Sequence, residues 1–267
     1  MKIGVSQIII PGGVDDLLQL CRDAGYEVVE LSFGEGRDPD INLDEAGLRD
    51  VAERCRQAGV AISSLIARYK QGSFLSTDPK LRDGARKSLS RALEIAEILG
   101  AKTVLLHPGQ VEASASYLET YDQFIKDMRS MGPEAEGRQV NIGIENVWNR
   151  FMLSPKEACD IVDAIDNPWI GVYLDTGNMM AYGYPEQWIR DLGHRIKAVH
   201  FKDFKRREHR FVPLMDGDCP WPEVVDGLRS VGYPGAVVHE VSGDRDLQIE
   251  MAKRMRRIVG GETPLSD

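Results

Sequence analysis

The chain has 267 residues, 42% of them hydrophobic and 28% charged, which is ordinary for a soluble globular protein that buries a large core. Its 42 acidic side chains outnumber its 33 basic ones, and the net charge of −9 opposes attraction to nucleic acids and anionic membranes. No stretch is apolar for long enough to span a bilayer. We therefore expect a soluble, cytoplasmic protein with no nucleic-acid or membrane partner.

Short runs of β-branched residues alternate with longer amphipathic runs along the whole chain, which is typical of βα units that build a parallel sheet. The first run is interrupted by Ser6 and Gln7 and predicts a strand, not a signal peptide. Eight strands are predicted, over residues 2–8, 26–32, 60–66, 102–107, 139–145, 169–175, 195–201 and 235–240. Helices fill the intervals, the longest over 79–99 and the last over 245–259.

A glycine separates five of the predicted helices from the strand that follows. These glycines are Gly25, Gly59, Gly100, Gly193 and Gly232. Glycine adopts the left-handed conformation after a helix without steric cost, so the repetition indicates one recurring βα unit. With eight strands, it predicts an α/β fold, a (β/α)₈ TIM barrel that forms a single domain over residues 1–267. A doubly wound open sheet is the competing arrangement, and no GxGxxG motif opens the first helix to support it.

The four cysteines are far apart in the sequence and form no CxxC pair. They are Cys21, Cys55, Cys159 and Cys219. This spacing fits neither a zinc–thiolate site nor a dense disulfide framework. We expect reduced thiols, three of which pack as small hydrophobic groups within helices.

The last four predicted strands each end in a residue that binds metals. Glu145, Asp175, His200 and Glu240 occupy these ends, and in a barrel the carboxyl ends of the strands meet at one face. Three carboxylates and one imidazole favour one divalent cation, with Mn²⁺ as the first choice and Mg²⁺, Co²⁺ or Zn²⁺ as alternatives. The sequence therefore predicts a metal-dependent enzyme.

The segments GIENVWNRF, VYLDTGNMM, AVHFKDFK and VVHEVSG resemble strand ends of the sugar phosphate isomerase/epimerase family, the xylose isomerase-like TIM barrels. That family includes ketose 3-epimerases and L-ribulose- or L-xylulose-5-phosphate 3-epimerases. The resemblance implies that Glu145, Asp175, His200 and Glu240 bind the metal and that the two glutamates act as the catalytic acid and base. It thus predicts an epimerase or isomerase of a ketose or ketose phosphate, with proton transfer through a metal-stabilised cis-enediolate.

Further polar residues near the strand ends are candidates for substrate binding. They are Glu30, His107, Asn178, Lys202 and Arg206. Glu30 can equally be a structural acceptor, and His107 a buried histidine with satisfied hydrogen bonds. His239, beside Glu240, is expected to point towards the helices, because side chains alternate along a strand.

The sequence departs from the free-ketose epimerases at two substrate contacts. Asn178 stands where they carry a histidine, and a second glutamate of theirs is absent near Phe151 and Met152. The segment FKDFKRREHR concentrates basic residues in an otherwise acidic chain, and a phosphate group needs such donors. These features favour a ketose phosphate and assign its phosphate to Lys202 or Arg206. Three tryptophans, Trp148, Trp188 and Trp221, can either wall off the pocket or pack against helices, and packing is the expectation.

Other functions remain open at this point. A metal-dependent dehydratase of a cyclic polyol or keto-polyol uses the same kind of barrel and is the main alternative. An AP endonuclease of the endonuclease IV type needs more histidines than the five present. A sugar-binding module without catalysis would be expected to lack a metal ligand. The expected partner is a small sugar or sugar phosphate, and the aromatic segment at 181–188 is a candidate contact in a homodimer or homotetramer.

Overall fold

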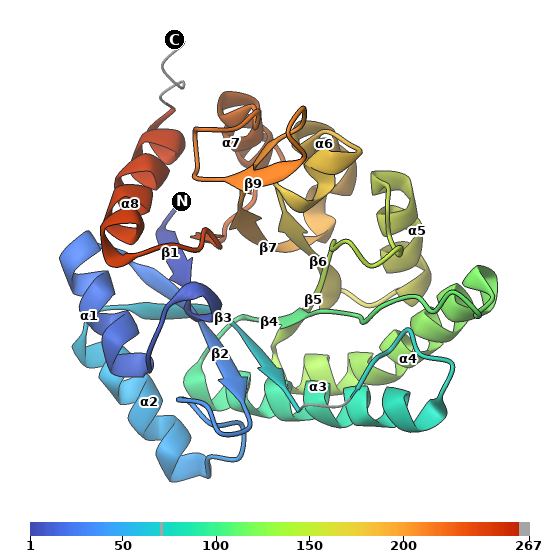
Figure 1. The fold of residues 1–267 in the computed structure, drawn as a ribbon. Coiled ribbons are helices and arrows are strands. Elements are labelled where there is room, and N and C mark those ends of the chain that lie inside the picture. Colours follow the sequence, from blue (N-terminus) through green and yellow to red (C-terminus); the bar gives the residue numbers. More distant parts are fainter. Residues whose placement is uncertain (70–71, 262–267) are drawn as a thin grey trace.

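The computed structural model describes residues 1–69 and 72–261, and within them eight parallel strands close into a barrel (Figure 1). The order around the barrel is β1-β10-β7-β6-β5-β4-β3-β2, with β1 pairing to β10 to close the ring. The barrel strands are β1 (Ile3–Ser6), β2 (Val28–Gly34), β3 (Ala61–Arg68), β4 (Thr103–Leu106), β5 (Asn141–Glu145), β6 (Ile170–Asp175), β7 (Ile196–Phe201) and β10 (Val237–His239).

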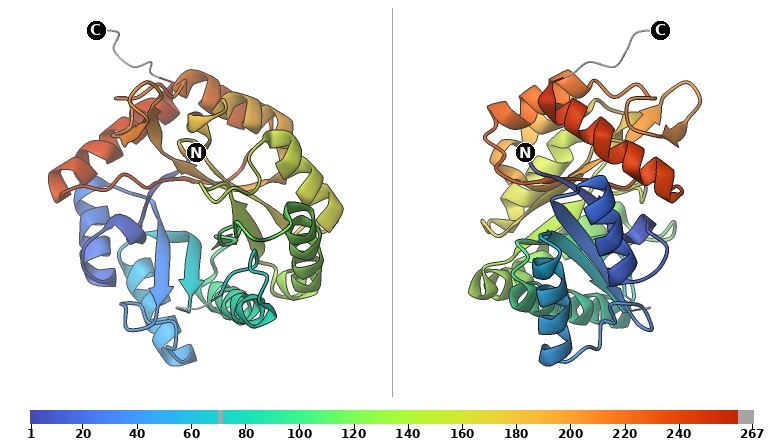
Figure 2. Two further views of the ribbon diagram at one scale, coloured as in Figure 1. Left: turned by 45° about the vertical axis from the view of Figure 1, so that its right-hand side comes forward. Right: turned by 90° about the vertical axis from the view of Figure 1, so that its left-hand side faces the viewer.

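The α-helices surround the strands in chain order (Figure 1). They are α1 (Val14–Ala24), α2 (Glu45–Gln57), α3 (Pro79–Leu99), α4 (Tyr117–Arg138), α5 (Pro155–Ile165), α6 (Pro185–Leu192), α7 (Trp221–Ser230) and α8 (Arg245–Gly260). Figure 2 shows the first and last helices, α1 and α8, side by side, and they contact each other directly. The closed TIM barrel predicted from the sequence is therefore confirmed.

Each predicted strand is present, with ends that differ by at most two residues. The five glycines all have positive φ, between 56° and 74°, so each uses the conformation that glycine alone adopts cheaply. One prediction is wrong: α4, with 22 residues, is longer than α3, with 21. The Gly132-Pro133 pair reads as a helix break, but α4 continues through it because its packing outweighs the local preference.

A small antiparallel hairpin after β7 was not predicted. It consists of β8 (Asp203–Lys205) and β9 (Arg210–Val212). The buried carboxylate of Asp203 anchors it by accepting hydrogen bonds from the backbone N–H groups of Phe204, Met215, Gly217 and Cys219 and from the ring N–H of Trp221. A charge with this many donors is stable when buried, so Asp203 holds the loop after β7 in one shape.

The apolar core has two parts. The larger one lies between strands and helices, and a smaller cluster of Ile66, Leu105, Tyr173 and Ala198 is separate from it. The cysteines are free thiols, as predicted. Within the described part of the chain, no helix is both long and apolar enough to cross a bilayer.

His239 points away from the barrel interior and joins β10 to the helical layer. Its ring is fully buried, and its Nε2 lies 2.6 Å from the hydroxyl of Tyr26, which donates to the carbonyl of Gln248 in α8 at 2.7 Å. Burial lowers the pKa of His239 to about 3, so the ring is neutral and can accept a hydrogen bond at one nitrogen. The predicted outward orientation of His239 agrees with this arrangement.

Replacement of Tyr26 by phenylalanine should destabilise the fold, because it removes the hydroxyl group while the aromatic ring and its packing remain. The hydroxyl bridges two buried partners, so its loss leaves both unsatisfied and should lower the free energy of unfolding by about 1–3 kcal/mol. Urea unfolding followed by circular dichroism measures this difference. The control is Tyr182→Phe, because Tyr182 is 48% exposed. Equal stability of both variants would contradict the bridging role.

Candidate active site

Four predicted ligands lie together at the carboxyl end of the barrel. Glu145 ends β5, Asp175 ends β6, His200 lies in β7, and Glu240 directly follows β10. One ligand atom from each side chain lies within 4.8 Å of the others. The structure thus gathers four residues that are up to 95 positions apart in the sequence, counting from Glu145 to Glu240.

Strand register explains why these side chains converge. Asp175 and His200 are direct partners across β6 and β7, and Val238 is the partner of His200 across β7 and β10. Glu240 lies two residues beyond Val238, so the alternation of side chains along the strand brings it to the same interior side. The cluster therefore spans an arc of four neighbouring strands, with Glu145 and Glu240 at its two ends.

Glu30 lies in a buried polar layer beside this cluster. Its carboxylate accepts hydrogen bonds from the hydroxyl groups of Ser6 (2.8 Å), Ser64 (3.0 Å) and Tyr173 (2.7 Å). The His200 Nε2 atom lies 3.1 Å from Glu30 Oε1. Burial by itself raises the pKa of Glu30, but the His200 ring and these hydrogen bonds outweigh it and leave the pKa below its ordinary value. Glu30 is therefore ionised, and it accepts a hydrogen bond from the Nε2–H group of His200.

This hydrogen bond orients the other nitrogen of His200 towards the carboxylates. Nδ1 lies 3.7 Å from Glu145 Oε1 and 3.7 Å from Glu240 Oε2. Burial by itself lowers the pKa of His200, but the charges of Glu30 and Glu240 outweigh it and raise the pKa. With Nε2 donating to Glu30, a cation bound at Nδ1 would take the place of the second ring proton. A histidine fixed by a carboxylate behind it is the usual arrangement at metal sites.

The donor set fits a divalent cation. The buried His200 Nδ1 has no hydrogen-bond partner among the described residues, which is costly unless another group binds it. Burial, with repulsion from Glu240, raises the pKa of Glu145 to about 7, whereas His200 opposes the shift. Clustered carboxylates of this kind are stabilised by positive charge, and three oxygens with one nitrogen suit Mn²⁺, Mg²⁺, Co²⁺ or Zn²⁺.

Lys202 supplies one positive charge within the cluster. Its Nζ lies 2.8 Å from Glu240 Oε2 and 3.0 Å from Asp175 Oδ2. Burial disfavours the charged ammonium, but these two carboxylates more than compensate and raise its pKa. Lys202 thus lies at the predicted metal site.

The remaining predicted substrate-binding residues, Asn178, His107 and Arg206, differ in their contacts. The backbone N–H of Asn178 donates to Asp175 Oδ1 at 2.8 Å, and its side-chain amide donates to the carbonyl of Asn146. His107 is exposed, with Nδ1 accepting from the backbone of Gly109 at 3.2 Å. Arg206 donates to the carbonyl of Met180 and stacks on Tyr184, with 4.7 Å from its guanidinium to the ring centroid.

A cavity of about 280 Å³ opens beside the carboxylates. That volume is close to the lower end of the range for ligand pockets and suits a small substrate. Glu145, Glu240, Lys202, Asn178 and His107 line it, whereas Arg206 does not.

The wall of this cavity includes residues that sequence reasoning missed. They are Ile8, Ile66, Arg68, Leu105, Val147 and Phe211. Trp148 also lines it and is 44% exposed, so the packing expected of the three tryptophans is wrong for Trp148, whereas Trp188 and Trp221 are buried as expected. Trp148 stacks on Phe211 of the hairpin, with 5.1 Å between ring centroids, which shows why the unpredicted hairpin matters here. Arg68 ends β3 and obeys the same strand-end rule as the ligands, but the predicted strand stopped at residue 66.

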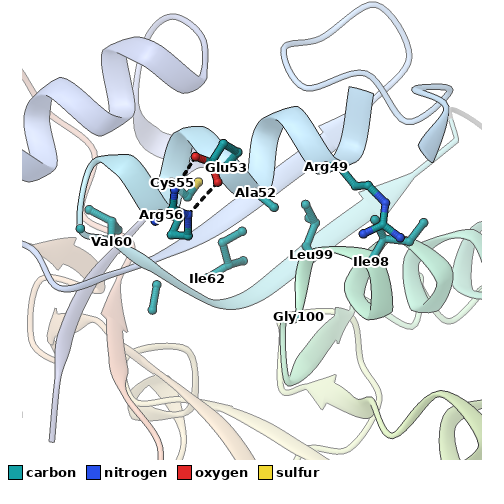
Figure 3. Close-up of a pocket in the computed structure, with 12 residues that line it drawn as sticks. Arg49, Ala52, Glu53, Cys55, Arg56, Val60, Ile62, Ile98, Leu99 and Gly100 are labelled. Atoms are coloured by element: carbon teal, nitrogen blue, oxygen red, sulfur yellow. Dashed lines mark hydrogen bonds and ion pairs between the residues drawn. The ribbon is translucent and has the colours of Figure 1, made fainter. Parts of the chain in front are cut away.

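A wider pocket of about 600 Å³ lies between α2 and α3 (Figure 3). It includes the beginning of β3 and Gly100, which precedes β4, so it lies at the end of the barrel opposite the carboxylate cluster. Its charged groups pair on their own helix, as in the 2.5 Å contact between Arg56 and Glu53 that Figure 3 shows. With no converging polar groups, it is not the better candidate for an active site.

Replacement of Glu30 by glutamine should weaken metal binding. The amide has one acceptor oxygen where the carboxylate has two, so it cannot accept from Ser6, Ser64, Tyr173 and His200 together. Loss of the hydrogen bond behind a histidine ligand costs about 10–100-fold in metal affinity. Calorimetric titration with Mn²⁺ measures the change.

The matched control is Glu53→Gln, which removes the same charge from the surface of α2. An unchanged Mn²⁺ affinity in Glu30→Gln would show that Glu30 does not support His200.

Comparison with known proteins places the chain in a family. The model of the xylose isomerase-like TIM barrel family matches residues 18–258. L-ribulose-5-phosphate 3-epimerase of Escherichia coli (strain SMS-3-5) is 26% identical over 262 residues, which cover 95% of this chain and 92% of that protein. Among solved structures, a D-tagatose 3-epimerase-like protein has 23% identity and a TM-score of 0.82, covering 97% of this chain and 98% of its own. D-psicose 3-epimerase of Clostridium cellulolyticum H10 is 16% identical, with a TM-score of 0.81, and the match covers 98% of this chain and 100% of that chain. The chain belongs to the xylose isomerase-like TIM barrel family.

Proposed function

We propose that this protein is a divalent-metal-dependent 3-epimerase of a ketose phosphate, with a pentulose 5-phosphate as the substrate. Its L-ribulose-5-phosphate 3-epimerase relatives, which match it over nearly the whole chain, make it a sugar epimerase. The observation that carries the finer proposal is the convergence of Glu145, Asp175, His200 and Glu240 within 4.8 Å beside a small cavity.

The proposed roles follow from the positions of the two glutamates. Glu145 and Glu240 lie at opposite ends of the arc of ligand strands, so a carbon held between them is open to both carboxylates. One carboxylate removes the proton next to the carbonyl, and the other returns a proton to the opposite face, which inverts the configuration. Asp175 and His200 complete the ligand set between them.

A divalent cation bound by these residues would supply the positive charge that makes a proton beside a carbonyl acidic enough to remove. The side chains of Trp148 and Phe211 give the cavity an aromatic wall, and an apolar wall strengthens electrostatic interactions beside it. Glu30 keeps His200 in the required orientation through its hydrogen bond to Nε2.

Removal of metal should abolish turnover and lower stability together. Dialysis against a chelator is expected to reduce epimerisation to the background rate, and addition of Mn²⁺ should restore it. Because a ligand that binds only the folded state stabilises it, Mn²⁺ at 100 times its Kd should add about 2.7 kcal/mol to the free energy of unfolding. Full activity of protein shown by elemental analysis to be free of metal would contradict the proposal.

Turnover of a panel of ketoses and ketose phosphates in deuterium oxide tests the chemistry. We expect deuterium at the carbon whose configuration inverts, and a product whose mass otherwise equals that of the substrate. Loss of water from the product would instead identify a dehydratase.

Glu145→Gln and Glu240→Gln should each lower kcat by about 10³-fold, because a general acid or base contributes about 10²–10⁴-fold. Glu208→Gln, on the turn between β8 and β9, is the control. Circular dichroism and bound Mn²⁺ are measured for each variant, so that loss of metal is separated from loss of proton transfer. Normal turnover in either variant would exclude that glutamate from the acid–base pair.

A further inference from the structure

Most of the basic residues that follow β7 have partners within the protein, and of the basic residues in this segment only Lys202 lines the cavity. Lys202 contacts Asp175 and Glu240, and Arg206 bonds the carbonyl of Met180 outside the cavity. Lys205 and Arg210 both pair with Glu208 on the hairpin. The expectation that Lys202 or Arg206 binds a phosphate therefore finds no support in these contacts.

Arg68 is the cation that the cavity leaves uncommitted. It ends β3 and lines the cavity, and among the described residues it has neither a carboxylate nor a hydrogen-bond acceptor as partner. Its backbone pairs with Gly34 of β2, so the side chain starts from a rigid strand end. A guanidinium that reaches a ligand cavity and has no partner in the protein is available to an anion.

His107 lies beside Arg68 at the same cavity wall. It follows β4, the neighbour of β3, and lines the cavity. Its Nδ1 accepts a hydrogen bond from Gly109, so the neutral ring carries its proton on Nε2 and offers a donor. Although the side chain reaches solvent, the surrounding atoms desolvate the ring and lower the pKa of His107, and the nearby charge of Arg68 adds to this shift.

The two halves of the barrel mouth thus carry different groups. The carboxylate cluster occupies the arc β10-β7-β6-β5, whereas Arg68 and His107 come from β3 and the end of β4. Ile66 and Leu105, at the ends of the same two strands, provide an apolar surface in the cavity. A short sugar whose carbonyl end lies at the carboxylate cluster would extend its other end towards Arg68.

We propose that Arg68, assisted by His107, forms an anion subsite that binds the phosphate group of a ketose phosphate and so discriminates against the free ketose. This inference rests on the proposed function, because it assumes that the carbonyl end of the sugar lies at the carboxylate cluster. The planar guanidinium matches two phosphate oxygens at once, which a lysine cannot do.

The test compares Arg68→Gln with wild-type protein loaded with Mn²⁺. The ligands are L-ribulose 5-phosphate, L-xylulose 5-phosphate and the two free pentuloses, and both calorimetric binding and turnover are measured. Charge-assisted hydrogen bonds contribute about 1.5–3 kcal/mol, which corresponds to a loss of about 10–150-fold in affinity. We expect that loss in Kd and KM for the phosphorylated ligands, with kcat and all values for free pentuloses changed less than about threefold.

Two further variants sharpen the result. Arg206→Gln removes the same charge outside the cavity and should leave every value unchanged within about threefold. Arg68→Lys keeps the charge but not the planar fork and should recover part of the lost affinity. Thermal unfolding of each variant checks that the fold is intact, as expected for Arg68, whose side chain is exposed.

The outcomes separate this inference from the proposed function. Phosphate-dependent binding that disappears in Arg68→Gln, without turnover of any ligand, would support the subsite and refute the epimerase. The subsite would be overturned if Arg68→Gln bound phosphorylated and free pentuloses equally more weakly, or bound neither more weakly. It would also be overturned if the wild-type protein did not prefer the phosphorylated pentuloses. In each of those cases, turnover by the wild-type protein would still support the proposed epimerase function.

Discussion

Concentration of negative charge at one end of the barrel is the constraint on which the site depends. Glu30, Glu145, Asp175 and Glu240 surround His200 in a nearly dry space, where like charges repel strongly. Within the described residues, Lys202 is the cation that contacts this group directly. The hydrogen bonds to Glu30 compensate one of these charges, and the unpartnered Nδ1 of His200 faces the remaining carboxylates. Both features favour a divalent cation as the group that neutralises the remaining negative charge.

Rigid strands hold the charged groups, and loops shape the space above them. Each of the four proposed ligands lies in or next to a barrel strand, where backbone pairing holds its main chain in place. The cavity wall depends instead on Asp203, which holds the loop after β7 and brings Phe211 against Trp148. One buried carboxylate thus connects the local structure of a hairpin to the shape of the substrate cavity.

Charge in the sequence and charge available to a ligand are different quantities. The segment after β7 is rich in basic residues, but Lys205 and Arg210 pair with Glu208, and Arg206 donates to a backbone carbonyl. Arg68 stands alone in its segment of sequence and is still the uncommitted guanidinium of the cavity. Proximity to a carboxylate, not the number of basic residues, decides which cation remains free.

The sequence by itself determined the barrel and the clustering of Glu145, Asp175, His200 and Glu240, because both depend on local patterns. Strand periodicity, helix-ending glycines and a ligand-type residue at each of four strand ends can be read without coordinates, and strand alternation also gives the outward direction of His239. Only the tertiary structure decided the partners of Glu30, the pairing of Lys202 with Asp175 and Glu240, and the exposure of Trp148 in the cavity wall. Each of these is a contact between segments far apart in the chain, and such contacts depend on barrel stagger and loop packing, which leave no periodic trace in the sequence.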